Sequence, residues 1–165
     1  VEQGLRVIRL RPSNHTGAGQ SSGLVVASFA RQVARIEAGL QAPVIEVGNL
    51  EPRRDFLDVR DVCAAYIACI ARRDVIAPGT IFNLSSGEAR RVGDVLDALI
   101  ATAGIAVEIR VDPRRIRTTD VNLAWCDAAR AREALGWAPN KPWQQTLQDV
   151  LDDWRRRIAT DPASP

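Results

Sequence analysis

Arginine side chains are the residues whose number and spacing in this sequence most clearly suggest chemistry. The chain of 165 residues holds 22 lysines and arginines together, and nearly all are arginines. Arg53 and Arg54 stand in one segment, and Arg114, Arg115 and Arg117 stand in another. Because each guanidinium offers paired donors to phosphate oxygens, two such segments that meet in the fold would hold a diphosphate. Two solvated basic loops are the alternative, and the sequence leaves both open.

A glycine-rich segment at residues 17–23 has the spacing of a dinucleotide-binding loop, GxGxxxG. Such a loop should follow its strand immediately, yet five residues separate Arg11 from Gly17. The acidic residue expected about 20 positions further on, at the end of a second strand, has no convincing candidate. We therefore predict a turn or mobile loop here and not a cofactor site.

Several catalytic constellations are absent from the sequence. Tyr66 is the only tyrosine and the residue four positions later is Ile70, so a Tyr-x-x-x-Lys pair cannot occur. His15 is the only histidine, and we expect it to form hydrogen bonds within its loop. No Ser/His/Asp triad or paired carboxylates are evident. We predict no catalytic residue and no metal site within the chain.

The composition is that of an ordinary globular protein, with 46% hydrophobic and 25% charged residues. The net charge of +2 gives no support for nucleic acid or an anionic membrane as a partner. Cys63, Cys69 and Cys126 lack metal-ligand or disulfide spacing. We expect them to be small buried residues in a reducing, cytoplasmic environment.

The hydrophobic periodicity predicts strands that alternate with helices, which is the α/β class. Strands are expected at residues 5–11 (ended by Pro12), 44–47, 54–57, 80–84 and 107–111. Helices are expected at residues 24–38, 58–72, 92–103, 127–135 and 142–158. Asp58 is a good N-cap for the second helix, which should bury Val62, Ala65, Tyr66 and Cys69. Residues 13–22 are expected to form a loop.

Five segments resemble motifs of the extended short-chain dehydrogenases, the NAD-dependent epimerase/dehydratase family that acts on nucleotide sugars. Residues 11–20 resemble its RPxNxxGPGQ motif, and residues 48–61 resemble its GxxxRDFxxVxD block. Residues 82–87, 112–121 and 135–139 resemble its (Y/F)N(V/L)xSG, DPxRxRPxDV and LGWxP motifs. The motifs occur in the order found in the family, between about residues 5 and 158.

The resemblance implies a fold in which an N-terminal Rossmann domain binds NADP or NAD and a smaller C-terminal domain binds the nucleotide sugar. The chain resembles the C-terminal half. Residues 1–22 would be a late Rossmann strand and active-site loop, and residues 23–159 a nucleotide-sugar-binding α/β region with some elements that return to the Rossmann domain. Residues 160–165 are expected to be a disordered tail. The glycine-rich cofactor loop and the Tyr-x-x-x-Lys pair would precede Val1, so we expect this chain alone to be inactive.

The resemblance also implies roles for individual residues. Pro12 and Ser13 would line the nicotinamide end of the cofactor, and Asn14 would contact the sugar or its diphosphate. The nucleotide and diphosphate would be bound by Ser28, Arg31, Arg54, Arg117 and Asp120, of which Asp120 accepts hydrogen bonds from the ribose.

Within the family, the sequence is most similar to members that reduce GDP-4-keto-6-deoxy-D-mannose with NAD(P)H. A GDP-mannose 4,6-dehydratase, a nucleotide-sugar 4-epimerase and a non-catalytic nucleotide-sugar-binding domain are the alternatives. The expected partners are a nucleotide sugar, with GDP favoured, and a second copy of the chain in a homodimer. Neither nucleic acid nor a membrane is expected.

Overall fold

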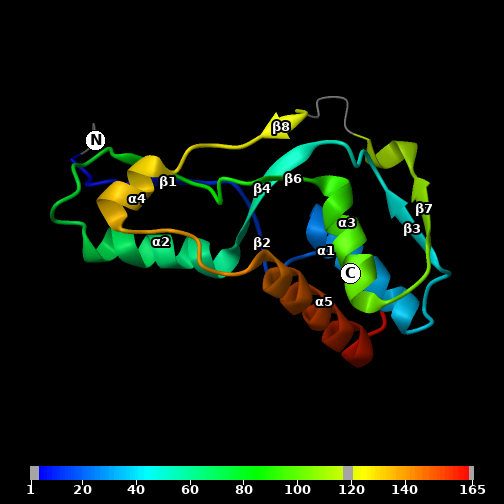
Figure 1. Ribbon diagram of the computed structural model, residues 1–165. Coiled ribbons are helices and arrows are strands. Elements are labelled where there is room, and N and C mark those ends of the chain that lie inside the picture. Colours follow the sequence, from blue (N-terminus) through cyan, green and yellow to red (C-terminus); the bar gives the residue numbers. More distant parts are fainter. Residues whose placement is uncertain (1–3, 117–120, 164–165) are drawn as a thin grey trace.

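The computed structural model describes residues 4–116 and 121–163 and confirms the α/β class. Helices cover Val25–Glu37 (α1), Val59–Ala71 (α2), Val92–Ala103 (α3), Ala129–Leu135 (α4) and Trp143–Thr160 (α5), with a 3-10 turn at Pro113–Arg115 (η1). Strands cover Arg9–Pro12 (β1), Asn14–Thr16 (β2), Val44–Val47 (β3), Arg53–Asp58 (β4), Ile81–Leu84 (β5), Ala89–Arg91 (β6), Glu108–Val111 (β7) and Leu123–Ala124 (β8). Figure 1 shows α2 and α4 at one end of an elongated molecule, with α1, α3 and α5 at the other.

The strands form three small sheets, and the longest strand, β4, organises the largest of them. The first half of β4 lies between antiparallel β6 and parallel β8, and its second half pairs with parallel β2. The other two sheets are the parallel pairs β1–β5 and β3–β7. Strand β4 therefore reaches from one end of the molecule toward the other (Figure 1).

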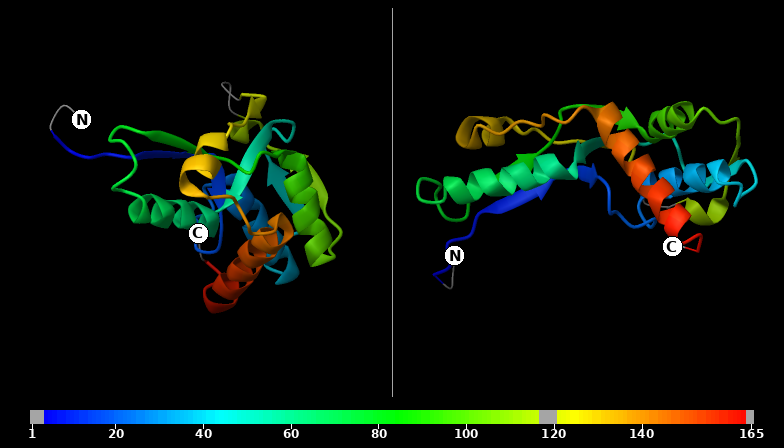
Figure 2. Two further views of the ribbon diagram at one scale, coloured as in Figure 1. Left: turned by 60° about the vertical axis from the view of Figure 1, so that its left-hand side comes forward. Right: turned by 90° about the horizontal axis from the view of Figure 1, so that it is seen from below.

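The described residues enclose two hydrophobic cores. The larger core packs α1, α3 and α5 against β3, and the smaller one packs α2 and α4 against β5. Figure 2 shows these two groups of helices at opposite ends of the molecule. Neighbouring residues of β4 enter different cores, because Phe56 packs in the larger core and Leu57 in the smaller one. The predicted division at residue 22 stays a prediction.

The ends of several helices follow the expected local rules. The Asp58 carboxylate caps α2 by accepting a hydrogen bond from the backbone N–H of Arg60 at 2.8 Å. Gly104 and Gly136 end α3 and α4 with φ angles of 65° and 62°, in the left-handed region that glycine tolerates best. Asp58 and these glycines confirm the helix boundaries that the sequence predicts.

Some expected boundaries are wrong. The first strand begins at Arg9, not at residue 5, and it includes Pro12, because an edge position needs no N–H from proline. Part of the expected loop, Asn14–Thr16, is a strand that pairs with β4. The expected disordered tail is wrong at Thr160, which is the last residue of α5. The short strands β6 and β8 have too few residues to show a periodicity.

Helix α2 buries the predicted face except at Tyr66, since Val62, Ala65 and Cys69 are buried. Its buried face consists of Asp61, Val62, Ala65 and Cys69. Tyr66 is 52% exposed and Cys63 is exposed, so their predicted burial is wrong. Among the residues that the structure describes, no helix has the length and apolar character needed to cross a membrane.

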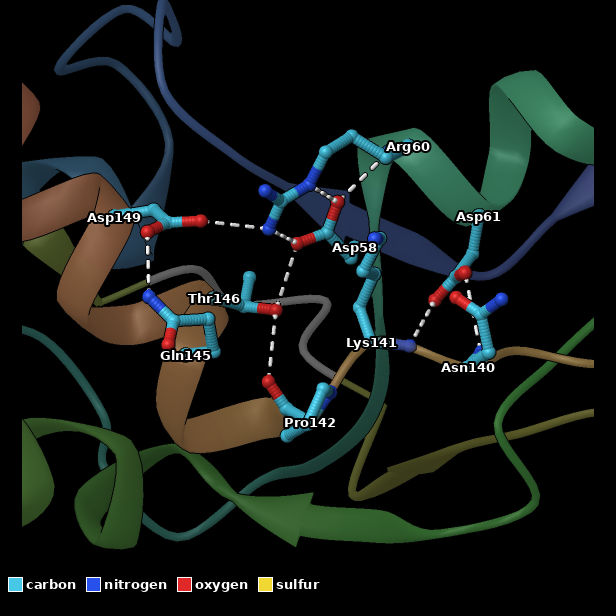
Figure 3. A network of polar contacts seen from close by, with 9 residues as sticks. All are labelled: Asp58, Arg60, Asp61, Asn140, Lys141, Pro142, Gln145, Thr146 and Asp149. Atoms are coloured by element: carbon cyan, nitrogen blue, oxygen red, sulfur yellow. Dashed lines mark hydrogen bonds and ion pairs between the residues drawn. The ribbon is translucent and has the colours of Figure 1, made fainter.

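A polar network joins α2 to α5 beside the smaller core (Figure 3). The guanidinium of Arg60 binds both carboxylate oxygens of Asp58 and also reaches Asp149 on α5 at 2.7 Å. The hydroxyl of Thr146, also on α5, donates to Asp58 at 2.8 Å. The network therefore fixes the start of α2 against the first two turns of α5.

A second contact anchors the segment before α5. The carboxylate of Asp61 accepts hydrogen bonds from the backbone N–H groups of Asn140 and Lys141 at 3.1 and 3.2 Å. The indole N–H of Trp137 donates to the backbone carbonyl of Asp61 at 2.8 Å. Figure 3 shows Asp61 beside Asn140 and Lys141, which directly follow the LGWxP-like motif at residues 135–139.

Acid should weaken the Asp58 network. Burial of Asp58 alone would raise its pKa, but the hydrogen bonds from Arg60 and Thr146 and the charge of Arg60 place its pKa below the ordinary 3.8. The stabilisation is therefore complete above the pKa of the unfolded chain and is lost as pH falls through the lower folded-state pKa. As pH falls below about 5, we expect the free energy of unfolding of the wild type to decrease more steeply than that of an Asp58→Asn variant.

Denaturant titration at a series of pH values measures this difference. Asp74→Asn is the matched control, because Asp74 lies exposed beside Arg73. Curves for wild type and Asp58→Asn that run parallel below about pH 5 would contradict the prediction.

Candidate functional site

Two adjoining cavities lie between α1, β3 and η1. Their volumes are about 540 and 470 Å³, and Ser22, Ser28, Glu46 and Arg115 line both. Because they share these residues, we describe them as one feature, the α1–β3 groove. The half with Arg31, Gln41 and Arg110 is its outer half. The half with Asn14 and Arg54 is its inner half.

The groove brings together four of the residues predicted from the sequence. Asn14 and Arg54 line the inner half, Arg31 lines the outer half, and Ser28 lines both. These four residues come from three elements, β2, β4 and α1. Segments far apart in the sequence therefore converge on one cavity system.

The other four predicted residues do not belong to the described lining of the groove. Pro12 and Ser13, which the structure describes, lie outside the lining of both halves, next to Asn14 in the chain. The hydroxyl of Ser13 is 3.3 Å from the sulfur of Cys126, and its backbone N–H donates to the carbonyl of Leu84. Arg117 and Asp120 lie outside the described residues.

Gln32 holds α1 and β3 together at the groove. Its side-chain amide is buried, and it donates to the carbonyl of Glu46 at 3.1 Å and accepts from the N–H of Glu46 at 2.8 Å. Both backbone groups of Glu46 on this edge of β3 are therefore satisfied by a residue of α1. Gln32 could not be predicted from the sequence, because a glutamine on an amphipathic helix carries no distinctive pattern.

The turn η1 brings Arg114 and Arg115 into the groove. The Asp112 carboxylate caps η1 and binds the guanidinium of Arg114 through two bonds of 3.0 Å each, and these hydrogen bonds lower the pKa of Asp112. A Cβ on Gly48 would come within 2.5 Å of the carbonyl oxygen of Arg115. Glycine is therefore required at this position for β3 and η1 to approach so closely.

Asp55 helps to position the inner half from the opposite face of β4. The sequence places Asp55 beside Arg54, but its buried carboxylate does not take part in the groove lining. It accepts hydrogen bonds from the Ser85 hydroxyl and from the N–H groups of Ser86 and Gly87, the latter two at 2.9 Å. Side chains alternate along β4, so burying Asp55 directs Arg54 toward the opposite face, where the groove lies.

The glycine-rich segment is a structured turn. The N–H of Gly19 donates to Asp153 on α5 at 2.9 Å, and Arg157 donates to the carbonyl of Gln20 at 3.2 Å. The predicted turn is confirmed, since the N–H of Gln20 also donates to the carbonyl of Gly17, and the turn is tied to α5. That this segment is not a cofactor site stays a prediction. The Nδ1–H of His15 donates one hydrogen bond within this region, to the carbonyl of Ser13 at 3.1 Å.

The charge of the groove suits an anionic ligand. Its described lining includes Arg31, Arg54, Arg110, Arg114 and Arg115. Three of these arginines also form ion pairs, Arg110 with Glu108, Arg114 with Asp112 and Arg115 with Glu46. Asn14 and Ser28 add neutral groups that form hydrogen bonds with hydroxyls. Among the described residues, no group of three acidic, histidine or cysteine side chains could hold a metal ion. The arrangement favours binding of a phosphorylated, hydroxyl-bearing molecule.

The chain is similar to known proteins over most of its length. The sequence profile of the family described as GDP-mannose 4,6 dehydratase matches residues 2–150. The chain is 37% identical over 158 residues to GDP-6-deoxy-D-mannose reductase of Pseudomonas aeruginosa. This alignment covers 96% of the chain but 51% of the relative, so the chain spans about half the length of the curated relative.

Solved structures agree with this similarity. The structure of RMD from Pseudomonas aeruginosa complexed with NADPH matches with a TM-score of 0.86 and 37% identity, over 94% of this chain and 50% of that one. UDP-glucose 4-epimerase with UDP-glucose from Thermotoga maritima matches with a TM-score of 0.79 and 27% identity, over 95% and 48%. The chain is thus similar in fold to proteins solved with a nicotinamide cofactor or a nucleotide sugar.

Proposed function

Since the chain belongs to the GDP-mannose 4,6-dehydratase family, we propose that the α1–β3 groove binds a GDP-linked sugar. The whole protein would then be an NAD(P)H-dependent reductase that converts GDP-4-keto-6-deoxy-D-mannose to a GDP-6-deoxyhexose. The observation that carries the proposal is the convergence of Arg54 with Arg114 and Arg115 on one cavity. The two arginine-containing segments that the sequence suggests for a diphosphate thus meet in space.

The groove supports an orientation for the ligand. Asn14 stands at the inner end, one residue after Ser13, so the proposed sugar lies at this end. The diphosphate would lie near Arg54, Arg114 and Arg115, where charge-assisted hydrogen bonds form to its oxygens. The nucleoside would then extend past Ser28 into the outer half beside Arg31. Arg117 and Asp120 are proposed to add a further diphosphate contact and a ribose contact.

The described residues fit only the nicotinamide end of NADP or NAD. Ser13 is held beside Cys126 and Leu84 at the end of β1, and this position supports a role for Pro12 and Ser13 in orienting a cofactor ring. In the described glycine-rich turn, the N–H of Gly19 already donates to Asp153 on α5, which argues against a role in binding the cofactor diphosphate. When bound, the cofactor supplies the hydride that the proposed reduction requires. The contribution of this chain is to hold the sugar close to that ring.

An epimerase is the second candidate, because UDP-glucose 4-epimerase of Thermotoga maritima shares the fold at 27% identity. Absorbance of NADPH during turnover by the full-length protein separates the two activities. A reductase consumes NADPH with each substrate molecule, whereas an epimerase or a dehydratase shows no net consumption. A homodimer stays a prediction.

Removal of the Arg54 guanidinium tests the groove directly. We expect Arg54→Ala to weaken GDP binding by about tenfold or more, because each charge-assisted hydrogen bond to phosphate contributes about 1.5–3 kcal/mol. Isothermal titration calorimetry with GDP measures the change. Arg73→Ala is the matched control, because Arg73 is an exposed arginine that follows α2, at the other end of the molecule.

The control variant should bind GDP as the wild type does. If Arg54→Ala also binds GDP unchanged, Arg54 does not contact the diphosphate and the proposed site is wrong. If the wild-type protein binds no GDP, the proposed function itself is wrong.

A further inference from the structure

Glu46 is the only acidic residue among the described residues that line the α1–β3 groove, whose lining also includes five arginines. Its side chain is 44% exposed and lies where the inner and outer halves meet. A carboxylate in a groove for a diphosphate repels the ligand's phosphates. Its presence therefore calls for a ligand group that donates hydrogen bonds.

The position of Glu46 is fixed by its surroundings. Its backbone is held on one edge by Gln32 and lies opposite Arg110 in the β3–β7 pair. Its carboxylate is 3.5 Å from the guanidinium of Arg115. That single ion pair leaves acceptor sites of the carboxylate available for a ligand, because a carboxylate has about four lone-pair positions.

The order of side chains along the groove indicates which ligand group Glu46 meets. Asn14 and Arg54 precede Glu46 from the inner end, and Arg31, Gln41 and Arg110 follow it. If the diphosphate lies near Arg54, the nucleoside lies near Glu46 and the outer half. This step rests on the proposed function, which places the sugar at the inner end.

Guanine is the base whose edge matches a carboxylate beside an arginine, as Glu46 lies beside Arg115. Its N1–H and N2–H₂ groups are adjacent donors, which suit the two oxygens of one carboxylate. Its O6 and N7 atoms are acceptors, which suit an arginine such as Arg110 or Arg115. Uracil offers one N–H between two carbonyl oxygens, so a carboxylate there meets one donor and two repulsive acceptors.

We propose that Glu46 is a specificity-determining residue, whose carboxylate accepts hydrogen bonds from N1–H and N2–H₂ of guanine and selects GDP-linked over UDP-linked sugars. A site built to bind a donor discriminates strongly against analogues that lack it. Two alternatives would give Glu46 a different role. It would bind the ribose hydroxyls, which GDP and UDP share, or it would serve only to hold Arg115.

Nucleotide titrations of the full-length protein separate these roles. The ligands are GDP, UDP and IDP, because IDP differs from GDP only by lacking the N2 amino group. We expect wild type to bind GDP about tenfold more tightly than IDP. In Glu46→Gln, GDP binding should weaken by about tenfold or more, UDP binding by less than about threefold, and the ratio of GDP to IDP affinity should fall toward one.

Glu133→Gln is the matched control, because Glu133 is an exposed residue on α4, at the end of the molecule opposite α1 (Figure 1). It should leave all three affinities unchanged. Thermal melting of both variants shows that any loss of binding does not come from unfolding.

The outcomes distinguish recognition of guanine by Glu46 from the proposed binding of a GDP-linked sugar in the groove. An equal loss of GDP, IDP and UDP affinity in Glu46→Gln overturns base recognition and assigns Glu46 to the ribose or to Arg115. Unchanged GDP affinity in Glu46→Gln overturns any contact with the nucleotide. In both cases GDP binding by wild type still supports the proposed function, whereas no GDP binding by wild type overturns both.

Discussion

Replacement of Asp55 by alanine is expected to destabilise the protein by about 3–5 kcal/mol. The carboxylate is fully buried in β4 and accepts three hydrogen bonds from Ser85, Ser86 and Gly87. Alanine would remove this acceptor from the buried Ser85 hydroxyl and from the half-buried N–H of Ser86, and each unsatisfied buried group costs about 1–3 kcal/mol. The N–H of Gly87 would keep its contact of 3.2 Å with the Ser85 hydroxyl oxygen. Asp55→Asn should fall between wild type and alanine, because its amide keeps one acceptor oxygen but adds an unwanted donor.

Denaturant unfolding monitored by circular dichroism measures the Asp55 effect. Asp94→Ala is the matched control, because the Asp94 carboxylate is exposed on α3 and forms only a 3.6 Å ion pair with Arg91. Such a surface pair contributes at most about 1 kcal/mol. If Asp55→Ala and Asp94→Ala destabilise equally, the buried hydrogen bonds do not hold the 85–87 loop against β4.

Truncation of Trp154 to alanine is expected to cost a similar amount, about 3–5 kcal/mol. Trp154 on α5 is 1% exposed and is the largest of the fully buried side chains. It belongs to the core that packs α5 against α1, and the guanidinium of Arg157 lies 4.7 Å from its ring centroid. The cavity left by the missing indole adds to the lost burial, because the surrounding helices relax only in part.

Trp125→Ala is the matched control for Trp154→Ala. Trp125 is 55% exposed, so removal of its indole should change the unfolding free energy by less than about 1 kcal/mol. Thermal melts of the two variants give the comparison. Equal melting temperatures for Trp154→Ala and wild type would contradict the importance of the α1–α5 contact.

Since Ser28 and Arg31 stand on α1, nucleotide binding by Trp154→Ala should also weaken.

Local sequence patterns determine much of the fold. Asp58, Gly104 and Gly136 mark helix ends by their own chemistry, and they do so without help from distant residues. The hydrophobic spacing also predicts the buried face of α2 at Val62, Ala65 and Cys69. It does not predict where this face ends, because only the partners from α4 and β5 decide that Tyr66 stays exposed.

The residues of the candidate site that belong to a sequence motif could be predicted. Those that only the tertiary fold brings to the site could not. Arg54 and the Arg114–Arg115 pair are recognisable because arginines cluster beside turn residues. Glu46 and Gln32 carry no such mark, since a glutamate in a short strand and a glutamine in a helix are ordinary. Their importance follows from the pairing of α1 with β3, which places one against the other.

The alternation of β4 between the two cores has an evolutionary consequence. Asp55, Phe56 and Leu57 each have a different environment, and a shift of one residue would exchange all of them. An inserted or deleted residue in β4 would bury Arg54 in place of Asp55 and move Phe56 toward the smaller core. Lineages that diverge from this sequence should therefore vary the length of surface connections such as residues 72–79, while the six residues of β4 keep their spacing.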